Sequence, residues 1–321
     1  MTLFGEKYSR AIVTGGAGFI GSHLVEELIG LGLQVVSLDD YSAGKEANLD
    51  SVRNSDQLTE IRCDISERDG LDEIFEGADI VFHEACSKNT ICLRDPGRDL
   101  EVNALGTLNA LTAARNAGVK KFIHASTGSV YGEPVQFPTN ERHPLAPVSY
   151  YGVSKLAADR YVAVFSLIHD MDTTVLRYHH VFGERQDNSD VGGVVSIFGR
   201  RALEDNPLII YGDGTQVRSF TYVKDVVRAN LLVAVTPETR GEAYNVASGI
   251  KVTIKELADA VLEYFGKPSL KIEYRDWKVG DIKVFNVDNT KLKSLGFEFH
   301  TEFREGLAIT LDSLVQFLGE N

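Results

Sequence analysis

Tyr151 and Lys155 lie four residues apart in the segment SYYGVSKLAADRY, which has the pattern of a helix. Residues at positions i and i+4 share one helical face, so the phenol and the ammonium are expected side by side. The ammonium, together with a positively charged nicotinamide ring, would lower the pKa of the phenol from about 10 toward neutrality. The tyrosine could then take a proton from a hydroxyl while a hydride leaves to the nicotinamide. This spacing is common on solvated helix faces, so its meaning depends on its surroundings.

Small hydroxyl residues follow an apolar run in HASTGSVYGE, at residues 124–133. The run at 121–125 predicts a buried strand, and Ser126 and Thr127 come directly after it. Hydroxyl side chains at the end of a buried strand form a simple turn or line a reaction site. The other motifs of the chain must decide between these two interpretations.

Three glycines follow one another at three-residue spacing in AIVTGGAGFIGSHL, between the first predicted strand and the first predicted helix. Glycine permits the tight turn and lets backbone N–H groups approach a pyrophosphate at the helix N-terminus, where the helix dipole favours anions. The pattern therefore predicts a dinucleotide site. Its predicted residues are Gly15, Gly18, Phe19 and Ile20, with Gly21 as the third glycine of the motif.

The second predicted strand ends in Asp39, at the distance from the glycines where dinucleotide-binding folds carry an acidic residue. A carboxylate there accepts hydrogen bonds from the adenosine ribose and would repel a 2′-phosphate. No arginine stands among the following ten residues, which contain only Lys45 as a cation. The sequence therefore predicts NAD rather than NADP. The residues predicted around the adenosine are Asp39, Asp40, Ser42, Asp64 and Ile65; for the last two a solvated turn is the alternative.

Apolar, β-branched runs alternate with helical patterns through the first half of the chain. Such nearly continuous runs suit parallel strands that are buried on both faces. The predicted strands are 11–14, 34–38, 59–63, 79–83, 121–125 and 173–178. The predicted helices include 19–31, 99–117 and 153–169. This alternation predicts an α/β fold with a Rossmann-type, doubly wound parallel sheet.

The alternation stops after Tyr178. Glycine, aspartate and asparagine cluster at 183–193, and two further helices are predicted at 254–265 and 303–318. We expect a smaller C-terminal α/β lobe for the substrate, with irregular segments that line a cleft. The predicted cofactor domain comprises residues 1–177 and 216–245, and the predicted substrate domain comprises residues 178–215 and 246–321.

Composition and charge argue against several classes of protein. The chain has 321 residues and a net charge of −13, whereas nucleic-acid binding needs clustered Lys and Arg. No run approaches the roughly 20 apolar residues of a membrane span, and no secretory apolar region is seen at the N-terminus. Cys63, Cys86 and Cys92 show no CxxC spacing, so we expect free thiols, no disulfide and no metal site. These features predict a cytoplasmic protein with no nucleic-acid or membrane partner.

Several motifs resemble those of the extended short-chain dehydrogenases/reductases. They are TGGAGFIGSHL, LDDYSAG, NALGT at 103–107, STGSVYG, SYYGVSK and GDGTQVRSFTYVKD. The likeness extends over nearly the whole chain and points to the nucleotide-sugar epimerase/dehydratase family, in the branch of the UDP-glucose (UDP-galactose) 4-epimerases. It implies NAD as cofactor, a nucleotide sugar as substrate, and a homodimer that pairs the helices at 99–117 and 153–169 across two subunits.

The resemblance also implies roles for individual residues. Thr127, Tyr151 and Lys155 would be catalytic, with Thr127 bonded to the substrate hydroxyl beside the tyrosine. Tyr151 and Lys155 would also bind the cofactor. Asn103 would support the cofactor site, and Lys88 aligns with a cofactor-side lysine of some members, although a surface lysine is the alternative. The implied substrate-binding residues are Lys88, Thr127, Gly128, Ser129, Tyr151, His180, Arg218, Lys278, Asp281 and Phe285.

Positions 128 and 129 bear on the type of reaction. Related 4,6-dehydratases carry Asp-Glu there, two acids that move protons during elimination, and UDP-glucuronate decarboxylases typically keep the Glu. Gly128 has no side chain and Ser129 is a poor acid. The chain therefore keeps the hydride machinery and lacks the elimination machinery, which predicts an NAD-dependent nucleotide-sugar 4-epimerase. The alternatives are a nucleotide-sugar dehydrogenase or reductase, on a GDP- or CDP-sugar among others, and a non-catalytic NAD-binding protein.

A few residues depart from the family pattern. His180 stands where an asparagine usually contacts the diphosphate; it can donate to a phosphate, with added charge if protonated, or simply pack. Lys278 replaces an arginine and loses its bidentate fork. Phe285 resembles a residue that limits the C2 substituent of the sugar, which would favour plain hexoses, and a core position is the alternative. No role is assigned to Glu84, Cys86 and His179. For Glu84 the alternatives are a contact with the substrate or cofactor and a turn-exposed acid, and for His179 a packed histidine is the alternative.

Overall fold

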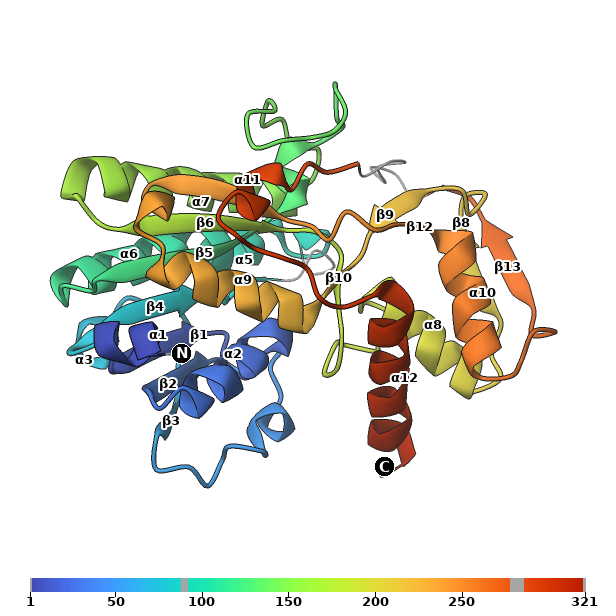
Figure 1. Ribbon diagram of the computed structural model, residues 1–321, viewed down its shortest axis with the longest axis horizontal. Helices are drawn as coiled ribbons and strands as arrows, with labels where there is room; N and C mark the ends of the chain where they lie inside the picture. The colour runs from blue at the N-terminus through green and yellow to red at the C-terminus, as the bar shows by residue number, and fades with distance from the viewer. Residues whose placement is uncertain (1, 88–91, 278–285, 320–321) are drawn as a thin grey trace. The chain divides into compact units, whose positions relative to one another are not determined.

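A computed structural model describes residues 2–87, 92–277 and 286–319 of the chain (Figure 1). The chain forms two compact units. The first unit comprises Met1–Gly132, Pro144–Tyr178 and Val227–Tyr244, and the second comprises Glu133–His143, His179–Val226 and Asn245–Asn321.

The first unit is built on a seven-stranded sheet with the order β11-β6-β5-β4-β1-β2-β3. Its strands are β1 (Arg10–Thr14), β2 (Gln34–Asp39), β3 (Leu58–Arg62), β4 (Ile80–His83), β5 (Lys121–Thr127), β6 (Thr173–Tyr178) and β11 (Glu242–Val246). Neighbouring strands from β3 to β6 pair in parallel. The order of the first six strands is that of a doubly wound Rossmann sheet, so the predicted fold class is confirmed. Every residue of β4 and β6 is buried, as expected for strands covered on both faces.

Helices cover this sheet. They are α1 (Thr2–Lys7), α2 (Phe19–Gly30), α3 (Leu71–Phe75), α5 (Pro96–Leu100), α6 (Gly106–Asn116), α7 (Tyr150–His169) and α9 (Val223–Val235). Phe75, Leu111 and Val162, from α3, α6 and α7, share one core with apolar residues of the strands. Helix α2 packs against β1 and β2. Tyr8, just after α1, donates to the carbonyl of Ala234 in α9 at 2.6 Å, so α1 lies against α9 (Figure 1).

Two predicted elements differ from the structure in an informative way. The helix predicted at 99–117 is α5, a π-helical segment η2 (Glu101–Leu105) and α6 in succession. The helix predicted at 153–169 begins earlier, at Tyr150, because the hydroxyl of Ser149 accepts from the Gly152 N–H at 3.1 Å and caps the N-terminus. Both differences lie next to predicted site residues.

The second unit combines short strand pairs with helices. Strand β7 (Val181–Phe182) pairs in parallel with β10 (Thr221–Tyr222), β8 (Leu208–Tyr211) in parallel with β13 (Ile272–Arg275), and β9 (Val217–Ser219) antiparallel with β12 (Lys251–Thr253). Its helices are α8 (Val194–Leu203), α10 (Ile254–Tyr264), α11 (Thr290–Lys293) and α12 (Phe303–Gly319). Thr253 and Glu256 form a capping box that starts α10. Helices α10 and α12 match the two predicted near the C-terminus.

Candidate cofactor and catalytic site

Gly15 turns the chain at the end of β1. Its φ is +66°, and a Cβ there would lie 2.8 Å from the backbone nitrogen of Ala85, so only glycine fits without strain. Gly18 then caps α2 without a side-chain hydrogen bond, and Phe19 and Ile20 form the first turn. The N–H groups at this helix end therefore have no side-chain cap to compete with an anion. The turn fits the pyrophosphate of the predicted dinucleotide.

Asp39 ends β2 and is 6% exposed. One carboxylate oxygen accepts from the N–H of Ala17 at 2.9 Å and the other from the N–H of Tyr41 at 2.8 Å. Burial raises the pKa of this carboxyl, while the two backbone bonds act against that shift. Each oxygen has further acceptor capacity, which suits the predicted contact with a ribose diol.

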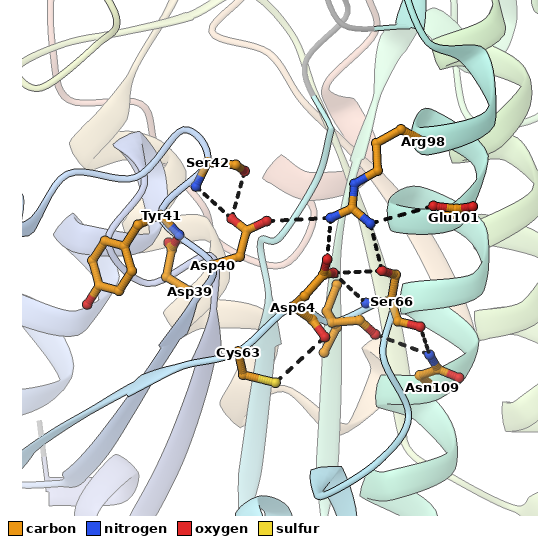
Figure 2. A network of polar contacts seen from close by, with 11 residues as sticks. Asp39, Asp40, Tyr41, Ser42, Cys63, Asp64, Ser66, Arg98, Glu101 and Asn109 are labelled. Carbon is orange, nitrogen blue, oxygen red and sulfur yellow. Dashed lines mark hydrogen bonds and ion pairs between the residues drawn. The ribbon is translucent and has the colours of Figure 1, made fainter.

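Asp40 and Asp64 lie in the turns that follow β2 and β3, on either side of Arg98 (Figure 2). Ile65, the neighbour of Asp64, is only 5% exposed, so this turn is not a fully solvated one. Burial would raise the pKa of Asp64, but its bonds to Ser66 and its ion pair with Arg98 outweigh burial and lower it. Asp64 is therefore ionised at neutral pH.

Thr127 is the last residue of β5 and the cap of the short 3₁₀ helix η3 (Gly128–Tyr131). Its hydroxyl accepts from the N–H of Ser129 at 3.1 Å and lies 3.3 Å from the Ser129 hydroxyl. Gly128 is buried. The hydroxyl cluster therefore builds a capped turn, and this turn also brings Thr127 into hydrogen-bonding contact with the phenol of Tyr151.

Tyr151 and Lys155 lie in the first turns of α7, and Lys155 is 1% exposed. Burial raises the pKa of Tyr151 well above 10, nearby Cys86 and Asp99 raise it further, and the Thr127 hydrogen bond lowers it only in part. In the protein without a cofactor, the pKa of Tyr151 is therefore raised, and the lowering predicted for Lys155 together with a nicotinamide ring stays a prediction. A further positive charge, such as an oxidised nicotinamide, is needed to bring this pKa toward neutrality.

Two buried histidines share the environment of Lys155. Burial, and after it the Lys155 ammonium, lowers the pKa of His83 to about 3 and that of His124 well below 6.5. Their rings stack with centroids 5.5 Å apart, and His83 lies within hydrogen-bonding distance of the hydroxyls of Thr14 and Thr107, at 2.8 and 3.0 Å. Both imidazoles are neutral, so they leave the positive charge of this region on the lysine.

Asn103 is fully buried in the π-helical segment. Its amide donates to the hydroxyl of Ser154 and to Asp99, both at 3.0 Å, and its oxygen accepts from the N–H of Ser87 at 2.9 Å. It thereby ties α7, next to Lys155, to the segment after β4. Through these bonds Asn103 holds the two segments together, and its role toward the cofactor stays a prediction.

Glu84 is a site residue to which the sequence assigned no role. It follows β4, and its carboxylate accepts from the phenol of Tyr178 at 2.7 Å, while the Asn230 amide donates to that phenol oxygen at 2.7 Å. Burial raises the pKa of Glu84 to about 7, against the opposing effects of Tyr178 and Lys155. An acid that titrates near neutrality therefore lies within the electrostatic reach of the predicted catalytic lysine.

His180 and Arg218 belong to the second unit. His180 has a φ of +41°, a region in which histidine is better tolerated than most residues. Burial, with the charge of Arg218, lowers the pKa of His180 well below 6.5, so the ring is neutral in the protein without a ligand. Arg218 is 6% exposed in β9. His179 is 2% exposed, and its backbone N–H donates to the backbone carbonyl of Val246 at 3.2 Å. It is therefore a packed residue.

Four predicted site residues lie outside the described residues: Lys88, Lys278, Asp281 and Phe285. Among the residues that the structure describes, no group of three His, Cys, Asp or Glu side chains could hold a metal ion. The same part of the chain contains no helix of the length and hydropathy that crossing a membrane requires.

Comparisons with known proteins identify the family. The model of the NAD dependent epimerase/dehydratase family matches residues 11–247. The UDP-glucose 4-epimerase of Mycolicibacterium smegmatis is 37% identical over 308 residues, which cover 94% of this chain and 97% of that protein. UDP-glucuronic acid decarboxylase 1 of Arabidopsis thaliana is 33% identical over 310 residues, covering 94% and 69%. The crystal structure of UDP-glucose 4-epimerase with UDP-glucose from Thermotoga maritima superimposes with a TM-score of 0.91 at 37% identity, covering 96% and 99%.

The chain therefore belongs to the NAD-dependent epimerase/dehydratase family of enzymes. The resemblance inferred from the motifs and the prediction of NAD as cofactor are both confirmed. The relatives include an epimerase and a decarboxylase, so family membership leaves the reaction and the substrate to be argued from the residues of the site.

Proposed function

We propose that the chain is a nucleotide-sugar 4-epimerase that interconverts UDP-glucose and UDP-galactose. The observation that carries this proposal is the turn after β5, where Thr127 contacts Tyr151 and is followed by Gly128 and Ser129 rather than by acids. The similar epimerases of Mycolicibacterium smegmatis and Thermotoga maritima support it, and the second of these binds UDP-glucose. The motif resemblance places the elimination acids of dehydratases at the two positions that here lack them.

In this mechanism the sugar C4 hydroxyl lies between Thr127 and Tyr151. Thr127 orients the hydroxyl through a hydrogen bond, and the ionised phenol of Tyr151 accepts its proton. The buried Lys155 ammonium stabilises the phenolate. NAD, held by the turn at Gly15 and by Asp39, would supply the acceptor and donor of the C4 hydride. The 4-keto sugar must turn within the site before the hydride returns, so that C4 receives it on the opposite face. Tyr151 then gives back the same proton, so the cycle needs no acid at position 128 or 129.

We also propose that the first unit carries the cofactor site and the second unit the nucleotide of the substrate. Arg218 suits the diphosphate because it is buried, and an arginine can offer a planar pair of donors to phosphate oxygens. His180 would add a neutral N–H donor. Lys88, Lys278, Asp281 and Phe285 keep their predicted roles within this proposal.

A homodimer is part of the same proposal. Helix α7 presents Val153, Tyr161, Val164 and Ile168 on its exposed side, and these are 53%, 41%, 43% and 66% exposed. Their spacings of eight, three and four residues put them on one side of the helix, in an apolar stripe that a second copy of α7 would cover. Light scattering should give a dimer for the natural chain, and the double substitution Val164→Glu and Ile168→Glu should give a monomer.

We propose that the enzyme is cytoplasmic. The cysteines Cys63, Cys86 and Cys92 form no disulfide, and the reducing cytoplasm would keep them as free thiols.

The experiment that tests the proposed function is incubation of the purified enzyme with UDP-, GDP- and CDP-sugars, with chromatographic separation of the products and absorbance at 340 nm. If the chain is an epimerase, UDP-galactose should form from UDP-glucose with no lasting rise in the absorbance at 340 nm. A stoichiometric rise in NADH would show a dehydrogenase instead. Release of carbon dioxide from UDP-glucuronate, or a 4-keto-6-deoxy product, would assign the chain to the decarboxylases or dehydratases of its family.

A further inference from the structure

Two turns at neighbouring strand ends have the same construction. Asp40-Tyr41-Ser42 follows β2, and Asp64-Ile65-Ser66 follows β3 (Figure 2). In the first turn, one oxygen of Asp40 accepts from the N–H and the hydroxyl of Ser42, at 2.8 and 2.7 Å. In the second turn, one oxygen of Asp64 accepts from the N–H and the hydroxyl of Ser66, at 2.9 and 2.7 Å. Each turn therefore has one carboxylate oxygen that its own serine does not use.

Arg98 of α5 joins these two remaining oxygens. Its Nη2 forms an ion pair with the second oxygen of Asp64 and lies 3.5 Å from the second oxygen of Asp40. Its Nη1 donates to the Ser66 hydroxyl at 2.8 Å and lies 3.6 Å from Glu101. Figure 2 shows the guanidinium between the two turns. We call Arg98, Asp40 and Asp64 the carboxylate clamp.

The clamp and α6 hold the second turn from two sides. The Asn109 amide of α6 donates to the carbonyls of Ile65 and Ser66, at 3.2 and 2.9 Å. The backbone of Arg98 is itself fixed, because its N–H donates to the Asp95 cap of α5 at 2.9 Å. The helix cap therefore fixes the backbone of Arg98, and its side chain links the turn after β3 to Asp40 in the turn after β2.

The charge balance explains why a cation is needed at this point. Three carboxylates, those of Asp40, Asp64 and Glu101, surround a single guanidinium. Without Arg98 the first two would repel each other and spread the turns, and the region would repel an anionic pyrophosphate. The guanidinium is also only 31% exposed, so its interactions are partly shielded from solvent.

The clamp lies where the adenosine half of the cofactor is predicted. Asp39, the predicted ribose ligand, precedes Asp40 in the chain, and Asp64 and Ile65 are the residues predicted to flank the adenine. An arginine beside the ribose would ordinarily be interpreted as a ligand of a 2′-phosphate. Here its guanidinium already donates to Asp64 and Ser66 and forms an ion pair with Asp40.

We propose that Arg98 is a positioning residue for the adenosine half of NAD: through the carboxylate clamp it holds the turns after β2 and β3 at the spacing that adenosine binding requires. This inference rests on the predicted placement of the adenosine at these turns, and it goes beyond the proposed reaction. It requires no contact between Arg98 and the cofactor. Loss of Arg98 should weaken every ligand that contains the ADP moiety and should leave the nicotinamide end unaffected.

The test compares ligand fragments by calorimetry on the cofactor-free enzyme. The variants are Arg98→Met, which keeps the aliphatic stem, and Arg98→Lys, which keeps the charge and loses the fork. Arg68→Met is the matched control, because Arg68 is 34% exposed and pairs with Asp72 at 2.5 Å in the same unit. The ligands are NAD, ADP-ribose and nicotinamide mononucleotide.

We expect Arg98→Met to lower the affinities for NAD and for ADP-ribose by a similar factor, roughly tenfold or more, as is typical for the loss of charged hydrogen bonds. Arg98→Lys should fall between Arg98→Met and the natural enzyme, and Arg68→Met should bind as the natural enzyme does.

Amide hydrogen exchange provides a second measurement that does not depend on ligands or turnover. Arg98→Met should lose protection at residues 40–42, whereas 108–112 in α6 should keep theirs. ADP-ribose binding equal to that of the natural enzyme would overturn the inference. An equal loss of nicotinamide mononucleotide affinity, or lost protection throughout the unit, would also overturn it, because either result indicates general loosening. Since neither measurement involves epimerisation, the inference and the proposed reaction can fail independently.

Discussion

Glu84→Gln should remove a pH dependence of stability that the natural chain carries. Burial raises the pKa of Glu84 to about 7, from about 4.5 in an unfolded chain. The folded state therefore favours the protonated acid, and its stabilising effect is fully present below about pH 4.5 and lost as the pH rises to about 7. The glutamine keeps an oxygen that can accept from Tyr178 and does not titrate.

The magnitude follows from the size of the shift. A difference of about 2.5 pKa units corresponds to about 3 kcal/mol in the free energy of unfolding. Glu84 keeps some exposed surface, so we take about 2 kcal/mol as the expected effect. Relative to the natural chain, Glu84→Gln should gain this amount between pH 4.5 and pH 7.5, and no more above that range.

Urea unfolding of the cofactor-free protein at a series of pH values measures this difference directly. Tyr178→Phe is the complementary variant, because it removes the hydroxyl that stabilises the ionised carboxylate and should steepen the loss of stability with pH. Stability curves of Glu84→Gln and the natural chain that run parallel from pH 4.5 to 7.5 would refute the assignment of this titration to Glu84.

Three further substitutions test other parts of the structure. Gly15→Ala should abolish measurable NAD binding and lower stability by about 1–3 kcal/mol, because it puts a Cβ at a φ of +66° and 2.8 Å from the Ala85 nitrogen; calorimetry and thermal melts measure both effects. Tyr151→Phe should lower turnover by at least about 100-fold while NAD affinity stays unchanged, since only the proton acceptor is lost; an active variant would contradict the mechanism. Lys121→Met should destabilise the chain by about 2 kcal/mol, because the buried ammonium pairs with the partly exposed Asp172 at 2.6 Å; an unchanged urea midpoint would count against this ion pair.

The sheet and the glycine turn could be predicted from the sequence because their signals are local. Short runs rich in β-branched and aromatic residues predicted β4 and β6 almost residue for residue, because strands buried on both faces do not alternate between apolar and solvent-facing positions. Gly15 was predictable because its spacing from the next glycines reports a turn that only this residue can form. The predicted helix at 99–117 concealed a π-helical segment, because that segment depends on the distant partners of Asn103.

The features of the site that the sequence missed depend on long-range contacts. Arg98 escaped a search for cations close behind Asp39, because the fold brings it to Asp40 from a different helix. The only local signal was the repeated Asp-x-Ser after two strands, at 40–42 and 64–66. The burial that raises the pKa of Tyr151 in the protein without a cofactor was not visible in the sequence, because the pattern shows the nearby lysine and does not show how deeply the phenol is buried. The raised pKa of Glu84 was not predictable from the sequence, because it depends on burial and on the distant Tyr178 and Lys155.

The central claim is that one hydride leaves C4 and returns to the same carbon. The most direct measurement uses UDP-glucose deuterated at C4, incubated with the enzyme in ordinary water, with the products analysed by NMR and mass spectrometry. The account predicts UDP-galactose that retains the deuterium at C4 and enzyme that still contains oxidised NAD. Deuterium found at C6, lost to solvent or held on released NADH would contradict it.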